Sequence, residues 1–389
     1  MPEAVFDQLA ELSSQEDRAQ LFERLIEELR SRGDYHHLFD ARMLQKKASL
    51  GLPLSRPSSL QDVPEEQRKE VEATYIEAAR ETGNAFLEQG DIPSAWMYFQ
   101  VIRDPAPVAA AIEALPNAID DYDRVDALVQ VALFQGVCPQ KGVELMLHAH
   151  GTCSTITALD QAMAQLEQDQ RAACASIMVR SLYTDVSDSV RRHVETRGQM
   201  LPPNEPLRTL ILGRDWLFEG GNYHVDVSHL NAVVRFARSI ESPEELDLAL
   251  QLAEYGSHLD SQLQYGGDPP FNDFYPAHVQ FFSVLLGKEA EEGLQYFRTQ
   301  LEAEPDEQDR PLLAYVLVDL LMRCGKLDEA VDVASKYLAN LGDDVSISFD
   351  ELCIKANRLD VLREVRKSQD DLVGYTAALL RTGNGTASA

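Results

Sequence analysis

The stretch GNAFLEQGDIPSAWMYFQVIRDP, residues 83–105, decides the fold of this chain. Segments with apolar residues three and four positions apart lie on either side of Gly90. Glycine is the residue that most readily takes the left-handed conformation just past a helix end. Ala95 follows five positions later, where two helices joined by a short turn meet and need a small side chain. The stretch therefore predicts a hairpin of two helices.

The same spacing recurs near the other end of the chain, in VDLLMRCGKLDEAVDVASKYLANLG, residues 318–342. Gly325 takes the place of the turn glycine, and Ala330 follows five positions later. Less regular copies occupy residues 22–53 and 281–305, and a partial copy begins at Cys353. A single helical hairpin cannot bury its outer apolar stripe, so repeated copies predict hairpins that stack on one another.

The first hairpin resembles a tetratricopeptide repeat. The family's order of small, aromatic, glycine, alanine, aromatic and proline positions is matched by Gly83, Phe86, Gly90, Ala95, Phe99 and Pro107. The second hairpin matches the family at Leu321, Gly325 and Ala330. The chain departs from the family at the early tryptophan (Ala79 and Ala314) and at the late alanine (Ile102 and Tyr337). The resemblance implies a superhelical scaffold whose concave face binds peptides or protein segments.

Helical periodicity continues along the rest of the chain, and hairpins of alternating strands are absent. We therefore expect an all-α protein, in which antiparallel helical hairpins stack as a tetratricopeptide-like solenoid. Residues 1–115 and 279–389 would hold the terminal hairpins. Residues 116–278 would form a loop-rich helical middle region, with long loops at 219–229 and 264–278.

The composition of the chain limits the classes of partner that it is expected to bind. The chain has a formal net charge of −29, which opposes binding to nucleic acid phosphates and to anionic membranes. We expect another protein or a peptide segment as the partner. No signal-peptide pattern opens the sequence, and the five cysteines are scattered, so reduced thiols and a cytoplasmic location are expected.

The strongest hint of chemistry is the distribution of histidine. Seven of the nine histidines fall in residues 148–278, among aspartates and tyrosines. Imidazoles with carboxylates suit metal binding or acid–base catalysis near neutral pH. The candidate residues are His224 and His229 as bases or ligands, Asp226 as an orienting group, and His258, His278 and Tyr275 from an opposite wall.

Each of these residues also has a purely structural interpretation. Asp226 can cap the helix that begins after it, which places His229 in the first helical turn. Five residues along a helix turn His224 and His229 about 140° apart, so they converge only if His224 lies in the loop. Gly151 is typical of a helix end, and His148 and His150 would then lie in the last turn before it.

Two hypotheses of function remain open. The first is a helical-repeat scaffold for protein–protein interaction, with no cofactor. The second is an all-α enzyme or metal-binding protein that uses the central His, Asp and Tyr residues, with a divalent metal as its only expected cofactor. Phosphate-binding and dinucleotide-binding glycine motifs are absent, and so are metalloprotease histidine spacings.

Overall fold

The computed structural model describes residues 2–14, 17–339 and 348–383, and these residues form an all-α protein. Within these ranges there is no β-strand, and a single isolated bridge pairs Gly266 with Asp273. The prediction of an all-α fold is confirmed. None of the helices in the described ranges is both long and apolar enough to cross a membrane.

The chain divides into two compact units, residues 1–165 (unit 1) and 166–389 (unit 2). The division falls inside the predicted middle region, 116–278, between two helical segments. The three predicted regions therefore do not coincide with the two units.

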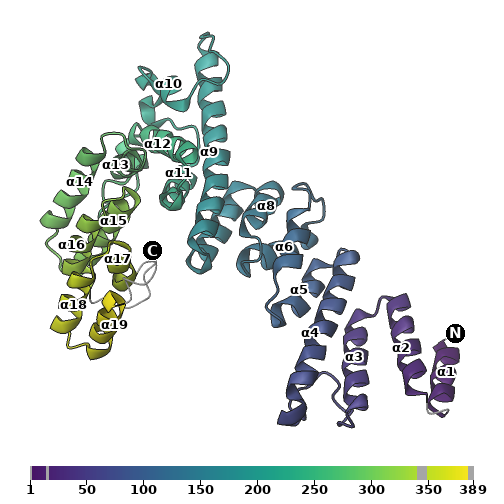
Figure 1. The fold of residues 1–389 in the computed structure, drawn as a ribbon. Coiled ribbons are helices and arrows are strands. Elements are labelled where there is room, and N and C mark those ends of the chain that lie inside the picture. Colours follow the sequence, from purple (N-terminus) through teal and green to yellow (C-terminus); the bar gives the residue numbers. More distant parts are fainter. Residues whose placement is uncertain (1, 15–16, 340–347, 384–389) are drawn as a thin grey trace. The chain divides into compact units, whose positions relative to one another are not determined.

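In unit 1, consecutive helices pack on one another along the chain: α1 on α2, α2 on α3, α3 on α4, and α4 on α5 (Figure 1). A short π-helical segment joins α7 to the last long helix. The elements are α1 (Pro2–Ser14), α2 (Arg18–Arg32), α3 (Tyr35–Ser49), α4 (Glu65–Glu88), α5 (Ile92–Val101), α6 (Ala106–Glu113), α7 (Tyr122–Val129), η1 (Gln130–Phe134), α8 (Pro139–Ala162) and η2 (Met163–Gln165).

In unit 2, the long helix α9 contacts α10, α11 and α12, and from α12 onward each helix contacts the next. The elements up to the middle of the unit are α9 (Gln168–Thr196), α10 (Leu207–Ile211), η3 (Asp215–Leu217), η4 (Glu219–Gly221), α11 (Val227–Phe236), η5 (Ala237–Ser239), α12 (Pro243–Ser257) and η6 (Ser261–Leu263). They are followed by α13 (Phe274–Leu285), α14 (Ala290–Ala303), α15 (Arg310–Arg323), α16 (Leu327–Tyr337), α17 (Phe349–Lys355), α18 (Leu359–Ser368) and α19 (Leu372–Gly383).

The predicted turns are helix ends with a left-handed residue. Gly90 has φ 77° and Gly325 has φ 74°. The residue after each glycine donates its backbone N–H to the carbonyl five residues earlier. Asp91 donates to Phe86 at 3.0 Å, and Lys326 donates to Leu321 at 2.8 Å. This pairing satisfies carbonyls that the helix end leaves open. The same ending occurs at the turns of the other copies, at Gly33, Gly287 and Asn357.

The small residues in the hairpins are where the helices touch. A Cβ on Gly83 would lie 2.5 Å from Cε2 of Phe99, so the absence of a side chain lets α4 and α5 approach. Ala95 and Ala330 are both fully buried. The last residues of the second predicted hairpin, 340–342, lie outside the described residues.

The predicted long loops are shorter than expected. α11 begins at Val227, inside the predicted loop 219–229, and α13 begins at Phe274, inside the predicted loop 264–278. Prolines in the second segment favoured a loop, but Pro276 is only the third residue of its helix. The first N–H groups of a helix have no intrahelical partner, so a proline there loses no hydrogen bond.

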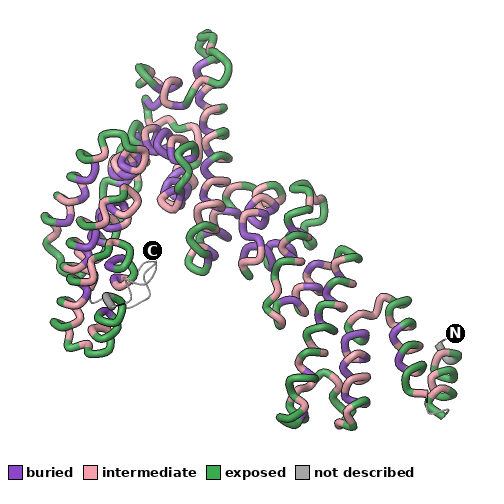
Figure 2. The backbone as a smooth tube through the Cα atoms, in the orientation of Figure 1, coloured by how far each residue is buried: buried purple, intermediate pink, exposed green. Residues whose placement is uncertain are grey.

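Burial follows the faces on which consecutive helices meet (Figure 2). In unit 1, Phe22, Ile26, Leu38 and Ala41 form the small core between α2 and α3. A second cluster joins α3 to α4 and includes Phe39, Met43, Val71 and Ala79. The connection between α3 and α4 is held by Lys47, a buried side chain whose ammonium donates to the carbonyls of Arg56 and Ser59 at 2.6 Å each.

Candidate functional site

A groove of about 340 Å³ opens within unit 1 where α3, α4 and α5 meet. Each helix lines it with residues that share one face: His36, Phe39 and Asp40 from α3, Tyr75 and Ala79 from α4, and Met97, Tyr98 and Val101 from α5. Ser58 joins them from the connection that Lys47 holds. The volume lies in the range of roughly 300–1,000 Å³ typical of ligand pockets.

Three aromatic rings form the walls of this aromatic groove. The ring centroid of Phe39 lies 5.0 Å from that of Tyr75 and 5.3 Å from that of Tyr98. Phe39 is buried, whereas the two tyrosines are half-buried and lie against the core cluster with one side. The walls are therefore fixed by the hydrophobic packing that joins α3 to α4.

The rim of the aromatic groove is apolar and open to solvent. Met97 is 60% exposed and Val101 is 59% exposed, and their four-residue spacing puts them on one face of α5. α5 contains no charged residue in its ten positions, so it cannot cover its outer face with charge as a surface helix normally does. Two exposed apolar side chains therefore lie side by side at the edge of the groove.

The polar groups of the groove lie around Tyr98. Its hydroxyl is 2.7 Å from Nδ1 of His36. Burial and the nearby Asp40 carboxylate raise the pKa of Tyr98 to about 12, so the phenol stays protonated at neutral pH. Asp40 itself is half-buried and makes neither a hydrogen bond nor an ion pair with any described residue.

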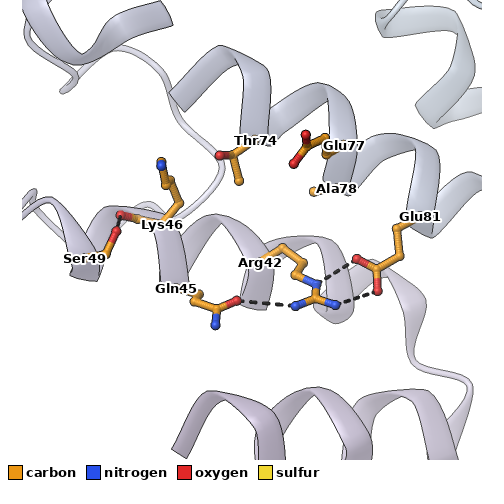
Figure 3. A pocket seen from close by; sticks show the side chains of 8 residues that line it. All are labelled: Arg42, Gln45, Lys46, Ser49, Thr74, Glu77, Ala78 and Glu81. Carbon is orange, nitrogen blue, oxygen red and sulfur yellow. Dashed lines mark hydrogen bonds and ion pairs between the residues drawn. The ribbon is translucent and has the colours of Figure 1, made fainter. Parts of the chain in front are cut away.

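A second pocket, of about 490 Å³, lies between α3 and α4 and is mostly polar. Figure 3 shows Arg42 of α3 between Gln45 of the same helix and Glu81 of α4. Arg42 donates to both carboxylate oxygens of Glu81, at 2.7 and 2.9 Å, and Arg30 bonds the same carboxylate. Although burial alone would raise the pKa of Glu81, these arginines hold it below its ordinary value. Arg42 is thus paired with Glu81, and Lys46 is paired with Glu70, while Glu77 forms no ion pair with any residue that the structure describes.

The central histidines converge only in part. His224 lies in the loop before α11, and its Nε2 is 2.9 Å from Nδ1 of His193 on α9. On its other side, Nδ1 of His224 is 3.0 Å from the hydroxyl of Tyr255 on α12. Burial, and secondarily His193, lower the pKa of His224 to about 4, so the ring is neutral at pH 7. Both of its nitrogens are engaged within the fold.

His258 reaches the same cluster through an aromatic ring. It stacks on Phe218 with ring centroids 5.3 Å apart, and Phe218 lies 6.1 Å from His224 on another side. The structure therefore links the three histidines in a row: His193 contacts His224, and Phe218 lies between His224 and His258. His193 was not among the candidates; it lies in the last turn of α9, 31 residues before His224 in the chain.

Asp226 and His229 do not join this cluster. Asp226 caps α11, where its carboxylate accepts from the backbone N–H of Ser228 at 2.8 Å and from the Ser228 hydroxyl at 2.6 Å. These hydrogen bonds lower the pKa of Asp226. His229 lies in the first turn of α11. Capping, the structural interpretation of Asp226, is what the geometry shows.

His278 and Tyr275 are fully buried on α13. The His278 ring lies between Phe271 and Phe274, with both centroids 4.3 Å away, and its Nδ1 is 2.7 Å from the Phe274 carbonyl. Burial, and secondarily Arg238, lower the pKa of His278 to about 3. The Tyr275 ring covers Gly256 of α12. Neither side chain opens to solvent, so both serve packing in this conformation.

Gly151 confirms the expected break after the other histidine pair, because it has φ 73° between two stretches of α8. His150 then pairs with Asp126 at 2.8 Å, from Nε2 to Oδ1. Over the described ranges, no set of three or more His, Cys, Asp or Glu side chains is arranged to hold a metal ion.

Comparisons of the chain with models of protein families, with curated proteins and with solved structures find no match. The likeness to tetratricopeptide repeats stays a prediction from the spaced residues. The aromatic groove itself was not predicted from the sequence, although the uncharged helix with Met97 and Val101 was a signal that pointed to it.

Proposed function

We propose that this chain is a helical-repeat scaffold that binds a segment of another protein in the aromatic groove of unit 1. In this proposal the hairpins stack as tetratricopeptide-like repeats, and the groove lies on the face that they present to the partner. The observation that carries the proposal is the open groove with aromatic walls and an exposed apolar rim at Met97 and Val101.

The chemistry of the groove favours an extended chain segment over a reacting substrate. Its walls come from three successive helices, so it is shaped by packing, and its tyrosines offer flat surfaces with a polar tip. Exposed methionine adapts its shape to different apolar partners. A net charge of −29 repels nucleic acid and anionic membranes, so we do not expect either as the partner. All five cysteines are free thiols, which supports a cytoplasmic location.

The alternative, an enzyme or metal-binding protein, has weaker support. Its best residues are His193 and His224, but the nitrogens of His224 already face His193 and Tyr255. Its carboxylate, Asp226, is used as a helix cap. The geometry therefore favours binding in unit 1 over chemistry in unit 2.

Selection of binders from a library of short random peptides tests the proposal. The full-length protein is the bait, and the enriched peptides are synthesised and their Kd values are measured by fluorescence anisotropy. The double variant Met97→Ser/Val101→Ser removes the apolar side chains of the rim without adding charge. The matched control is Leu212→Ser/Leu372→Ser, which changes two exposed leucines of unit 2 in the same way.

We expect the rim variant to weaken binding by about tenfold or more, since burial of two apolar side chains is lost. The control should bind as the unchanged protein does. Circular dichroism checks that both variants stay helical. Failure to enrich any peptide, or equal binding by the rim variant, would refute the groove as the binding site.

A further inference from the structure

The aromatic groove holds a carboxylate that has no counter-charge. Asp40 is the only acidic side chain among the nine residues that line the groove, and none of the nine is Lys or Arg. Asp40 is half-buried and, across the ranges that the structure describes, forms no ion pair. Two carboxylates on the same helices are matched, Glu81 by Arg42 and Glu70 by Lys46.

An occupant that fills the groove has to remove water from this carboxylate. A neutral segment would leave Asp40 without compensation, and an acidic segment would add repulsion. A cationic side chain offsets the loss with a charge-assisted hydrogen bond. The surrounding net charge of −29 attracts a basic partner and repels an acidic one at longer range.

The walls and the rim suit the two parts of such a side chain. The faces of Tyr75 and Tyr98 attract a cation through their negative charge distribution, and guanidinium groups also stack on them. The hydroxyl of Tyr98 stays neutral because its pKa is raised, so it needs no counter-ion in the groove. The methylene stem of Lys or Arg can lie along Met97 and Val101 while its head reaches inward.

We propose that the aromatic groove recognises an arginine or lysine side chain of the bound protein segment, with Asp40 as its counter-ion and Tyr75 and Tyr98 as its walls. This inference rests on the proposed function, because it names the chemistry of the segment that the groove takes. The specificity lies in the pairing of one carboxylate with aromatic faces, and the rim supplies apolar contact that any segment could use.

The test changes the charge on both partners, using peptides enriched by the full-length protein. In each peptide, arginine is replaced by citrulline, or lysine by norleucine, which keeps the shape and removes the charge. On the protein, Asp40→Asn removes the charge and Asp40→Glu keeps it. Asp7→Asn on α1 is the matched control, because it makes the same change outside the groove.

Enriched peptides should share a basic residue, and removing its charge should weaken binding by about tenfold or more. Asp40→Asn should weaken the basic peptides by a similar factor and leave the uncharged versions almost unchanged, which is the signature of a direct pair. Asp40→Glu should retain most of the affinity, and Asp7→Asn should retain all of it. If Asp40→Asn does not fold, the comparison of the charged and uncharged peptides decides alone.

Two failures are told apart by the rim variant. Peptides that bind through Met97 and Val101 but tolerate loss of their basic residue would overturn the inference and leave the proposed function standing. Peptides that bind equally well without the rim, or no enriched peptides at all, would overturn the proposed function and this inference with it.

Discussion

Unit 1 and unit 2 each contain a cluster of aromatic residues with histidine, and the two clusters differ in access to solvent. In the groove of unit 1, His36 is exposed and Tyr98 is half-buried. In unit 2, His278 and Tyr275 of α13 form the other cluster, called the unit 2 cluster below. Both are fully buried beneath α12 and the segment before α13. Residue types alone therefore do not separate an open groove from a core, whereas burial does.

The largest expected difference comes from removing one tyrosine from each cluster. Tyr275→Ala should lower the free energy of unfolding by about 3–5 kcal/mol, because a fully buried aromatic side chain leaves a cavity. Tyr98→Ala should cost less than half as much, since part of its ring already faces water. Urea unfolding of the full-length variants measures both changes. Equal losses would show that Tyr98 belongs to the core, and the comparison would fail.

The second difference concerns stability at acidic pH. His224 and His278 have their pKa lowered to about 4 and about 3 by burial, while an unfolded histidine titrates near 6.5. Below pH 6.5 the unfolded chain binds protons that the folded chain does not, so stability falls as the pH falls. The fully buried His278 should contribute a loss of about 1–2 kcal/mol between pH 6.5 and pH 5, and the half-buried His224 should contribute less, because solvent screens its charge.

The variant His278→Leu isolates one of these contributions. Its stability should depend on pH less steeply than that of the unchanged protein, whatever its stability at pH 7. Denaturant unfolding at a series of pH values measures the slope. An unchanged slope would mean that water reaches His278. The unit 2 cluster would then not differ from the groove in its access to solvent.

Much of this architecture follows from the sequence, because it depends on local contacts. Gly90 and Gly325 end their helices as the spacing predicts, and Asp226 caps α11 as one of its two interpretations predicts. The start of α13 was missed because the prolines in residues 264–278 favoured a loop, although Pro276 lies in the first turn of the helix, where a proline loses no hydrogen bond. Local rules work where the deciding hydrogen bonds connect residues a few positions apart.

The sites depend on contacts between distant parts of the chain, and the sequence says little about those. His193 and His224 are 31 residues apart, and the walls Phe39 and Tyr98 come from different hairpins. Histidine enrichment drew attention to the middle of the chain, where His278 is fully buried and packs between phenylalanine rings. The groove has fewer unusual residues and was not predicted, although the lack of charge on α5 is a signal that could have pointed to it.

The smallest expected effect tests how tightly the unit 2 cluster is packed. A Cβ on Gly256 would lie 2.3 Å from Cδ1 of Tyr275, and this ring is buried, so it cannot move aside into solvent. Gly256→Ala gains about 1 kcal/mol of helix propensity but should lose more than that to overpacking, for a net loss of about 1 kcal/mol. Gly266→Ala is the matched control, because nothing lies within 4 Å of its added Cβ, and it should change stability by less than about 0.5 kcal/mol. If Gly256→Ala proves stabilising in urea unfolding, Tyr275 has room to shift, and the unit 2 cluster is less rigid than the contrast with the aromatic groove requires.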